Sequence, residues 1–162
     1  MAIETIGALV FEKLLGSLPG RLARIFVSPQ KIASQVEIDL RRTNPIDINL
    51  GTEIPTLALY FRISNLSLVN LVLDRLLVDL WVGQPTLQAA LLARRDIPKR
   101  SSTEDVWFRR QLTVPQQRQI LDRAKGHVPS VRVTVDVEAY FESKIGWILV
   151  EKRLEHGDVP VK

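Results

Sequence analysis

A strict alternation of apolar and polar side chains between residues 130 and 142 constrains the fold more than any other feature of this sequence. Every second residue from Val131 to Phe141 is apolar, and the residues between them are polar or amphipathic. Successive side chains of a β-strand point to opposite faces, so this period of two predicts a long strand with one buried face. The buried face needs a second apolar surface to cover it, which predicts a layered β-structure.

Shorter segments with the same period occur along the chain from residue 34, separated by turn-forming residues such as Asn65–Ser67 and Gly83–Pro85. Thr113 and Gln116 form a capping-box pattern that predicts one helix, closed by Gly126, between the fifth and sixth strands. We therefore expect a mainly β fold, a seven-stranded antiparallel sandwich of the immunoglobulin or fibronectin-III-like type. Its expected strands are 36–41, 54–65, 70–82, 86–94, 103–112, 130–142 and 147–154, and the tail from Glu155 is expected to be loose.

The composition excludes several classes of site. The chain of 162 residues has no cysteine, which rules out disulfides, iron–sulfur clusters, thiolate zinc sites and a cysteine nucleophile. Only two histidines occur, His127 and His156, so one chain cannot supply a three-histidine metal site. His127 is expected in a loop and His156 in the tail. Because 46% of the residues are hydrophobic and 25% are charged, the chain is expected to be globular.

No pattern of side chains points to catalysis. The carboxylates Asp74, Asp79, Asp136 and Glu138 fit solvated strand faces better than a general acid–base pair. The glycine-containing stretch 16–20 lacks the Lys-Ser/Thr ending of a phosphate-binding loop. We therefore expect a protein that is not an enzyme, with no catalytic residue, cofactor, metal site or small-molecule substrate.

The charge pattern bears on partners and location. The formal net charge is +4, but the basic runs are interrupted by acidic residues, so no specific nucleic-acid partner is predicted. No stretch approaches the about 20 apolar residues of a membrane-spanning helix. Glu4 stands where a secretory signal would be positively charged. A cytoplasmic protein is expected, and a peripheral association with a membrane stays open.

Residues 1–30 form a separate unit in the sequence, an amphipathic helical arm, followed by the β-sandwich domain at 31–162. Apolar side chains recur every three or four residues in a helix expected at 2–16, with Gly16 as its C-terminal cap. Ser17 is expected to cap a second helix at about 18–27, which Ser28-Pro29 ends. The tentative partner-docking residues of this arm are Ile6, Val10, Phe11, Leu14, Arg21, Leu22, Arg24, Ile25 and Phe26.

Three roles remain open for this arm. It could pack on the body and cover an edge or end of a sheet. It could instead dock the chain onto a protein partner or a membrane surface. It could also be a disordered or cleaved leader. The outward aromatic residues of the strands bear on this choice, because the arm is expected to cover them unless they form a contact patch of their own; they are Tyr60, Trp81, Trp107 and Trp147.

Two turn residues are singled out for structural roles. The side chain of Asn65 can bond the backbone of a turn and tolerates a positive φ, and Gly83 lies in a turn with Gln84 and Pro85.

A family resemblance follows from the order of elements between about Ser34 and Leu154. Its carriers are Phe61 to Asn65, Leu76 with Val78 to Gly83, Asp96-Ile97-Pro98 with Ser101-Ser102, and Val133 to Val137. This pattern resembles the group-2 late embryogenesis abundant (desiccation-related) proteins and the related WHy domain. The family has Asn-Pro-Asn where this chain has Asn65-Leu66-Ser67, so only the first asparagine is kept.

The resemblance implies a non-catalytic β-sandwich protein linked to water stress, and this protective or accessory role is the leading expectation for the chain. The alternative is a structural or adaptor subunit of a membrane-associated or multi-protein assembly, docked through the arm.

Overall fold

Two four-stranded antiparallel sheets make up the body of the molecule. The computed structural model describes residues 10, 13–14, 16–125 and 127–162. In sheet A the central strand pairs with β1 and β2 along one edge and with β6 along the other. The strands of sheet A are β1 (Val36–Leu40), β2 (Ile46–Asn49), the central β3 (Thr56–Asn65) and β6 (Ser101–Gln111).

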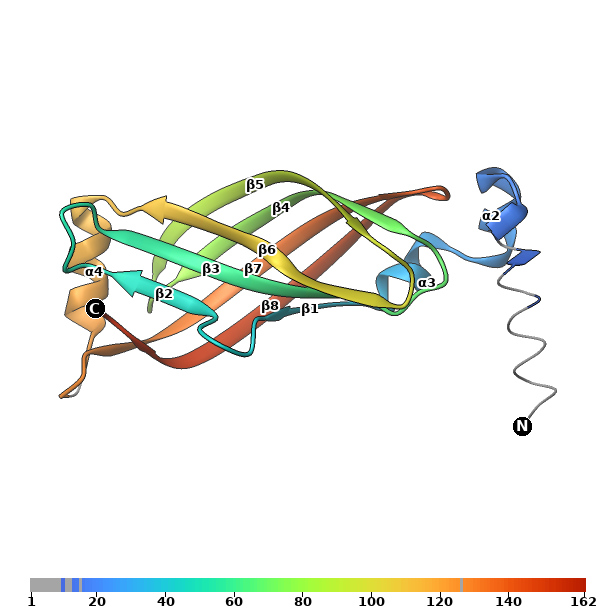
Figure 1. Cartoon of the computed structure of the whole chain (residues 1–162). Helices are drawn as coiled ribbons and strands as arrows, with labels where there is room; N and C mark the ends of the chain where they lie inside the picture. Colours follow the sequence, from blue (N-terminus) through green and yellow to red (C-terminus); the bar gives the residue numbers. More distant parts are fainter. Residues whose placement is uncertain (1–9, 11–12, 15, 126) are drawn as a thin grey trace, which may run out of the picture.

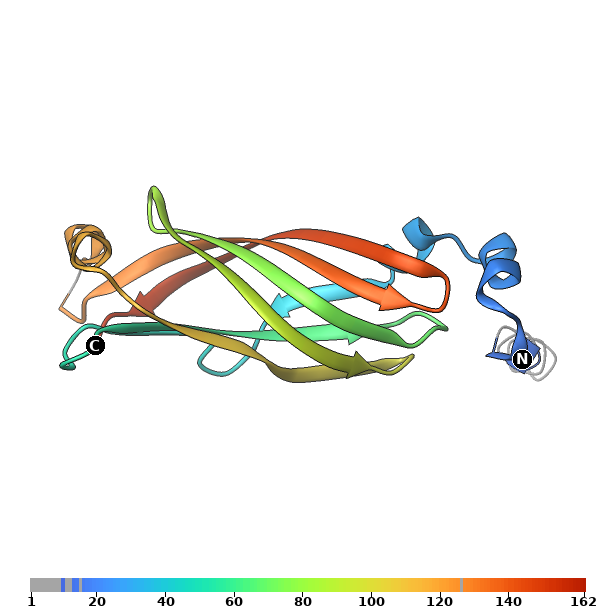
Figure 2. The same ribbon diagram turned by 90° about the horizontal axis from the view of Figure 1, so that it is seen from above.

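Sheet B has the order β5-β4-β7-β8, and all its pairings are antiparallel. Figure 2 shows the two sheets as two layers of an elongated molecule. Helices lie at the two ends of the sandwich, with α4 (Val114–Arg123) at one end and α2 (Gly20–Phe26) and α3 (Pro29–Ala33) at the other (Figure 1). The strands of sheet B are β4 (Leu71–Trp81), β5 (Pro85–Ile97), β7 (Ser130–Ser143) and β8 (Gly146–Pro160).

The core lies between the sheets and follows the alternation of the sequence. Every second residue of β7 from Val131 to Phe141 is buried, and the residues between them are exposed or half-buried. In β3 the inward residues Leu57, Leu59, Phe61 and Ile63 are fully buried, and the Phe61 ring stacks near Phe108 of β6 with centroids 6.4 Å apart. The β-sandwich expected from the period of two is therefore confirmed.

The described residues form eight strands rather than the seven that we expected. The additional strand is β2, which follows a break at Asn44, where φ is +48°, and Pro45. Asn-Pro was interpreted as the end of the first strand, but the chain resumes pairing one residue later and places Ile46 and Ile48 in the core. With β2 counted, the helix α4 follows the sixth strand and precedes the seventh.

The expectation of a loose tail is wrong. Strand β8 continues to Pro160, and Val159 is buried in the core. A register shift in this part of β8 and the positive φ of Asp158 let the strand continue beyond Gly157. Beyond it, the Lys162 N–H donates to the Ile48 carbonyl at 3.0 Å, and the Lys162 carbonyl accepts from Leu50. The last residues therefore join sheet B to strand β2 of sheet A.

Helix α4 closes one end of the sandwich. Its start matches the capping-box pattern, since the Thr113 N–H donates to Oε1 of Gln116 at 2.8 Å. Ile120 is fully buried, while the amide groups of Gln116 and Gln119 donate to the carbonyl and hydroxyl oxygens of Thr86, at 2.9 and 2.6 Å. These bonds tie the helix to the β4–β5 turn. The expectation that Gly126 closes the helix is wrong, because α4 ends at Arg123 and Ala124 is its C-cap; Gly126 itself lies outside the described residues.

Gly83 stands in the β4–β5 turn with a φ of +72°, in the left-handed region that glycine favours. A Cβ added there would also approach the Arg123 guanidinium to 3.1 Å. A side chain at this position would therefore disturb both the turn and the end of α4.

Asn65 joins three segments at the opposite end of the sheets. Its side chain is fully buried, and its Nδ2 donates to the carbonyls of Val69, Ile97 and Pro98 at 2.8, 3.1 and 3.2 Å. Its Oδ1 accepts from the N–H and hydroxyl of Ser67 at 3.1 and 2.6 Å. One asparagine thus satisfies backbone groups of the β3–β4 turn and the end of β5, which would otherwise be buried without partners.

We predict that Asn65→Ala lowers the free energy of unfolding by about 3 kcal/mol or more, because several buried polar groups lose their partner together. Chemical denaturation followed by circular dichroism measures this loss. Asn70→Ala is the matched control, since Asn70 is exposed and accepts one bond, from the Lys99 N–H. It should cost less than about 1 kcal/mol. Equal losses in the two variants would contradict the role of Asn65.

Candidate functional site at the arm end of the sandwich

Helix α2 packs on the tip of the β7–β8 hairpin, as Figures 1 and 2 both show. Gly20 lies so close to the carbonyl of Lys144 that a Cβ would collide with it. One turn later, Ala23 is fully buried, and the Arg24 Nε donates to the carbonyl of Ile145. These three residues form one face of α2, and this face fixes the arm to the body.

The short helix α3 closes the core beside α2 and was missed by the sequence analysis. Ser28-Pro29 was interpreted only as the end of a helix, but Ser28 also caps the next helix by accepting from the Lys31 N–H at 3.2 Å. Proline is favoured in the first turn of a helix, so the same dipeptide carries a signal for a start. Ile32 of α3 is fully buried in the core.

The described residues up to Ser17 are helical, so the first helix does not end at Gly16, and Leu18 and Pro19 separate it from α2. The Ser17 hydroxyl donates back to the Leu14 carbonyl at 2.9 Å, so this side chain belongs to the first helix. The expected cap of the second helix by Ser17 is therefore wrong, and Pro19 occupies the N-cap position of α2.

The candidate docking residues divide into four groups. Ile6 and Phe11 lie outside the described residues. Arg21 and Ile25 belong to the backbone of α2, and their side chains are likewise not among those described. Arg24 faces the hairpin. The exposed apolar members are Val10, Leu14, Leu22 and Phe26, with exposed fractions of 53%, 53%, 47% and 55%.

The described part of the arm does not cover the outward aromatic residues of the sheets. Trp107 and Trp147 remain exposed, which contradicts the expectation that the arm covers them. Trp107 stacks beside Tyr60 at 6.2 Å, and the Arg41 guanidinium lies 4.1 Å from the Tyr60 ring centroid. Trp81 is half-buried at the end of β4. The arm lies instead at the end of the sandwich, where its inner face contacts the hairpin and α3.

A cavity of about 470 Å³ lies at the base of the arm, between it and the ends of both sheets. Three cationic side chains line it, and its one carboxylate, Glu142, pairs with Arg94 at 3.0 Å. Its lining residues are Gly16 of the arm, Leu68, Val69, Asn70, Val72, Arg94, Lys99, Glu142, Ser143 and Lys144. The cavity therefore has a positive charge and polar groups that can donate hydrogen bonds.

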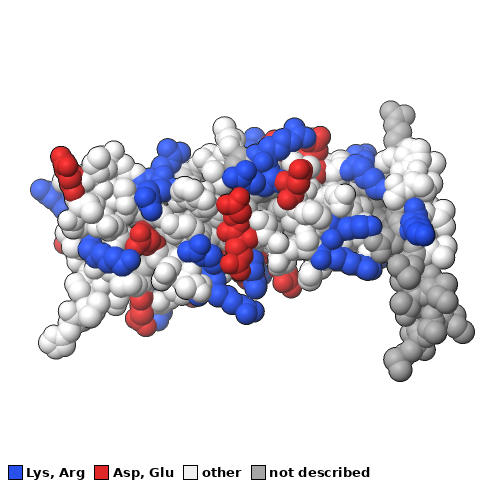
Figure 3. Space-filling view, in the orientation of Figure 1, with Lys and Arg blue, Asp and Glu red and all other residues white. Residues whose placement is uncertain are grey.

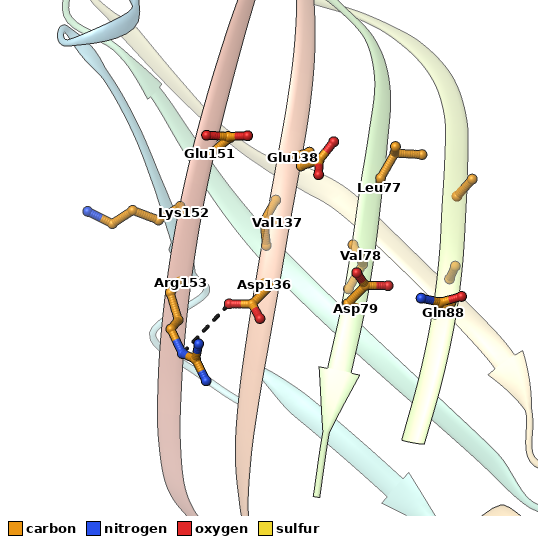
Figure 4. Close-up of a pocket in the computed structure, with 12 residues that line it drawn as sticks. Leu77, Val78, Asp79, Gln88, Asp136, Val137, Glu138, Glu151, Lys152 and Arg153 are labelled. Atoms are coloured by element: carbon orange, nitrogen blue, oxygen red, sulfur yellow. Dashed lines mark ion pairs between the residues drawn. The ribbon is translucent and has the colours of Figure 1, made fainter. Parts of the chain in front are cut away.

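A second hollow, of about 790 Å³, is a groove on the outer face of sheet B (Figure 4). Asp79, Asp136, Glu138 and Glu151 line it, and the apolar side chains that it exposes on this face include Leu77 and Ala90. Arg153 pairs with Asp136 at 3.7 Å. In the described part of the chain, no group of three or more His, Asp or Glu side chains is arranged to hold a metal ion. The predicted carboxylate residues Asp79, Asp136 and Glu138 thus share one solvent-open face.

Tyr140 lies on the same face as this groove. Its hydroxyl donates to Oε2 of Glu138 at 3.1 Å, and this bond, together with burial and the nearby Glu138 charge, raises the pKa of Tyr140 above its usual value. The Arg75 guanidinium, 4.2 Å from the centroid of the Tyr140 ring, opposes the shift. A phenol with a raised pKa stays protonated at neutral pH, so it acts here as a hydrogen-bond donor.

No helix within the described ranges is both long and apolar enough to cross a bilayer.

Comparison with known proteins gives structural neighbours but no family. No family model matches the sequence, and no curated protein matches it. The crystal structure of a protein from Archaeoglobus fulgidus aligns with 76% of this chain and 97% of its own, at 12% identity and a TM-score of 0.43. The solution structure of a provisionally assigned late embryogenesis abundant (LEA) protein aligns with 98% of this chain and 89% of its own, at 8% identity and a TM-score of 0.47.

We predict that Gly20→Ala releases the arm from the hairpin. In a helix, alanine is more favourable than glycine by about 1 kcal/mol, so the substitution by itself would stabilise α2. Any loss of protection from hydrogen exchange must therefore come from the collision of the new Cβ with the Lys144 carbonyl. Hydrogen–deuterium exchange of residues 17–33 should become about tenfold faster.

Gly16→Ala is the matched control, because a Cβ at Gly16 meets nothing within 4 Å. Unchanged exchange in Gly20→Ala, or equal acceleration in both variants, would mean that this contact does not hold the arm.

Proposed function

We propose that this chain is a non-catalytic accessory protein that docks onto a partner through its N-terminal arm. One observation carries the proposal. The inner face of α2 is fixed to the β7–β8 hairpin by Gly20, Ala23 and Arg24, while apolar side chains of the arm, among them Leu14 and Leu22, remain exposed.

A rigid apolar face at the end of an elongated molecule suits docking better than a mobile segment would. Burying an exposed leucine side chain contributes about 1.5–3 kcal/mol when it leaves water completely. Because the arm is already held in place, binding need not order it, and less of this free energy is lost to conformational entropy. Single exposed apolar residues are ordinary on protein surfaces, but several of them on consecutive helical segments of one arm favour an interaction site.

The test places a photo-cross-linking residue at Leu22 in the full chain and irradiates it in an extract of the source cells that retains membranes. We expect adducts with protein or lipid at this position, because Leu22 would lie in the interface. Leu121 is the matched control, since it is an exposed leucine on α4 at the opposite end of the molecule. The same adducts in similar yield from both positions, or none from Leu22, would contradict docking through the arm.

We propose a stress-protective role of the late embryogenesis abundant type as the second candidate. Its support is the sequence resemblance, whose residues hold positions on which the fold depends. Asn65 bonds the β3–β4 turn to β5, Phe61 and Ile63 lie in the core, and Val133 to Val137 are central in β7. In this proposal the sandwich protects other macromolecules by contact, without a chemical step.

A drying assay tests the protective role. We expect a dehydrogenase that loses activity on drying to retain more of it after rehydration with this protein than with an equal mass of serum albumin. Protection no better than that of albumin would speak against the stress-related candidate and would leave docking through the arm unaffected.

A further inference from the structure

We propose that the arm end of the molecule binds the surface of a bilayer that contains anionic phospholipids. This inference rests on the proposed docking function of the arm and names its partner. The binding surface, called here the arm-end surface, consists of the exposed apolar face of the arm, the β7–β8 hairpin and the cationic cavity between them.

The apolar part of this surface comes from two elements that lie side by side. Leu14 and Leu22 are about half exposed on the arm, and Trp147 on the adjoining hairpin is 61% exposed. Leu149, two residues farther along β8 on the same side, is exposed as well. Tryptophan is enriched at the interface between lipid and water, and an amphipathic helix lies in that interface with its apolar face toward the acyl chains.

The charge of the arm complements an anionic surface. Residues 13–35 contain four basic residues, Lys13, Arg21, Arg24 and Lys31, and no acidic residue. This run alone therefore carries a formal charge of +4, equal to the net charge of the whole chain. In Figure 3 blue side chains lie along the whole length of the molecule, and among the described residues no red ones show on this face at the end that carries the arm. The two glutamates upstream, Glu4 and Glu12, lie outside the described residues.

The cavity at the base of the arm adds positive charge beside the apolar face. Arg94, Lys99 and Lys144 line it together with one carboxylate, Glu142, and the polar side chains of Asn70 and Ser143. Arginine and lysine recognise phosphate oxygens through charge-assisted hydrogen bonds. A phospholipid presents a phosphate and an acyl chain together, so it matches a cationic cavity that borders exposed leucines and tryptophan.

Other occupants fit this surface less well. A nucleic acid would match the positive charge but would leave the exposed leucine side chains in water. An acidic protein could match both the positive charge and the exposed apolar side chains, and the experiment includes that outcome. The basic residues close to the apolar face are the feature that favours an anionic membrane, because such residues are attracted to its negative surface potential.

The test is flotation of the full chain with vesicles on a density gradient. We expect the protein to float with vesicles of phosphatidylcholine and phosphatidylglycerol, and about tenfold less with phosphatidylcholine alone. High salt should weaken the binding, because it screens exposed charges. Flotation that is equal on both vesicles, absent from both, or independent of salt would overturn the proposal.

Two matched pairs of variants locate the binding surface. Lys13→Glu with Lys31→Glu reverses two positive charges on the arm and the adjoining α3, and Arg118→Glu with Lys125→Glu makes the same change at the α4 end. Leu22→Glu removes an exposed apolar side chain from the arm, and Leu121→Glu does so on α4. Only the arm variants should lose flotation, by about tenfold, with thermal unfolding unchanged. Equal effects at the two ends would overturn the assignment of the surface.

The cross-linking and flotation results together separate this inference from the proposed function. Cross-links from Leu22 to a protein, without flotation, would overturn lipid binding and retain docking through the arm. The absence of both would overturn both. Flotation that depends on the arm charges, with lipid adducts at Leu22, supports both.

Discussion

The burial of two apolar sheet faces against each other is the interaction on which the rest of this structure depends. The chain has no cysteine, so no disulfide joins the sheets. The inward side chains of β3 and β7 are almost all fully buried, and each large one contributes about 1.5–3 kcal/mol. A shift of one residue in the register of either strand would turn this whole set toward solvent. The same register therefore also fixes where the turns, Asn65 and the hairpin tip lie.

The two ends of the sandwich are closed in different ways, so they present different surfaces to solvent. At one end, α4 is tied to the β4–β5 turn by hydrogen bonds from Gln116 and Gln119. At the other end, Ala23 and Ile32 close the core, while further apolar residues of the arm are left exposed. The second end therefore exposes apolar surface that is not needed to close the core. Most of the basic residues of the arm lie at this end as well.

Local sequence patterns predicted the elements with long, regular periods and missed those that depend on short or interrupted ones. The alternation in 130–142 was sufficient to define β7, but β2 has only four residues after an Asn-Pro break. The continuation of β8 is hidden by its irregular stretch around Gly157 and Asp158. Both elements owe their structure to pairing with a neighbouring strand across a break or an irregular stretch, which a local period does not encode. The start of α3 is encoded locally in Ser28-Pro29. This dipeptide was interpreted only as the end of one helix, although it also favours the start of the next.

The candidate site, too, could be predicted from local sequence only in part. The spacing of apolar residues predicted that the arm would carry an apolar face, and the exposed side chains of Val10, Leu14 and Leu22 fit that pattern. The sequence could not show which side of α2 would be covered. That side is decided by contacts of Gly20 and Arg24 with the hairpin at Lys144 and Ile145, more than a hundred residues away along the chain.

The break between β1 and β2 has a further consequence for how molecules of this protein behave when they are crowded. An exposed edge strand offers unpaired backbone groups on which the strand of another molecule can add. Here the edge of sheet A beside β3 is divided into pieces of five and four residues by Asn44-Pro45, and the last residues of the chain bond along the second piece. Neither piece offers a long template. When molecules of this protein are brought close together, as happens when water is withdrawn, sheet A therefore has little tendency to pair with strands of other molecules along this edge.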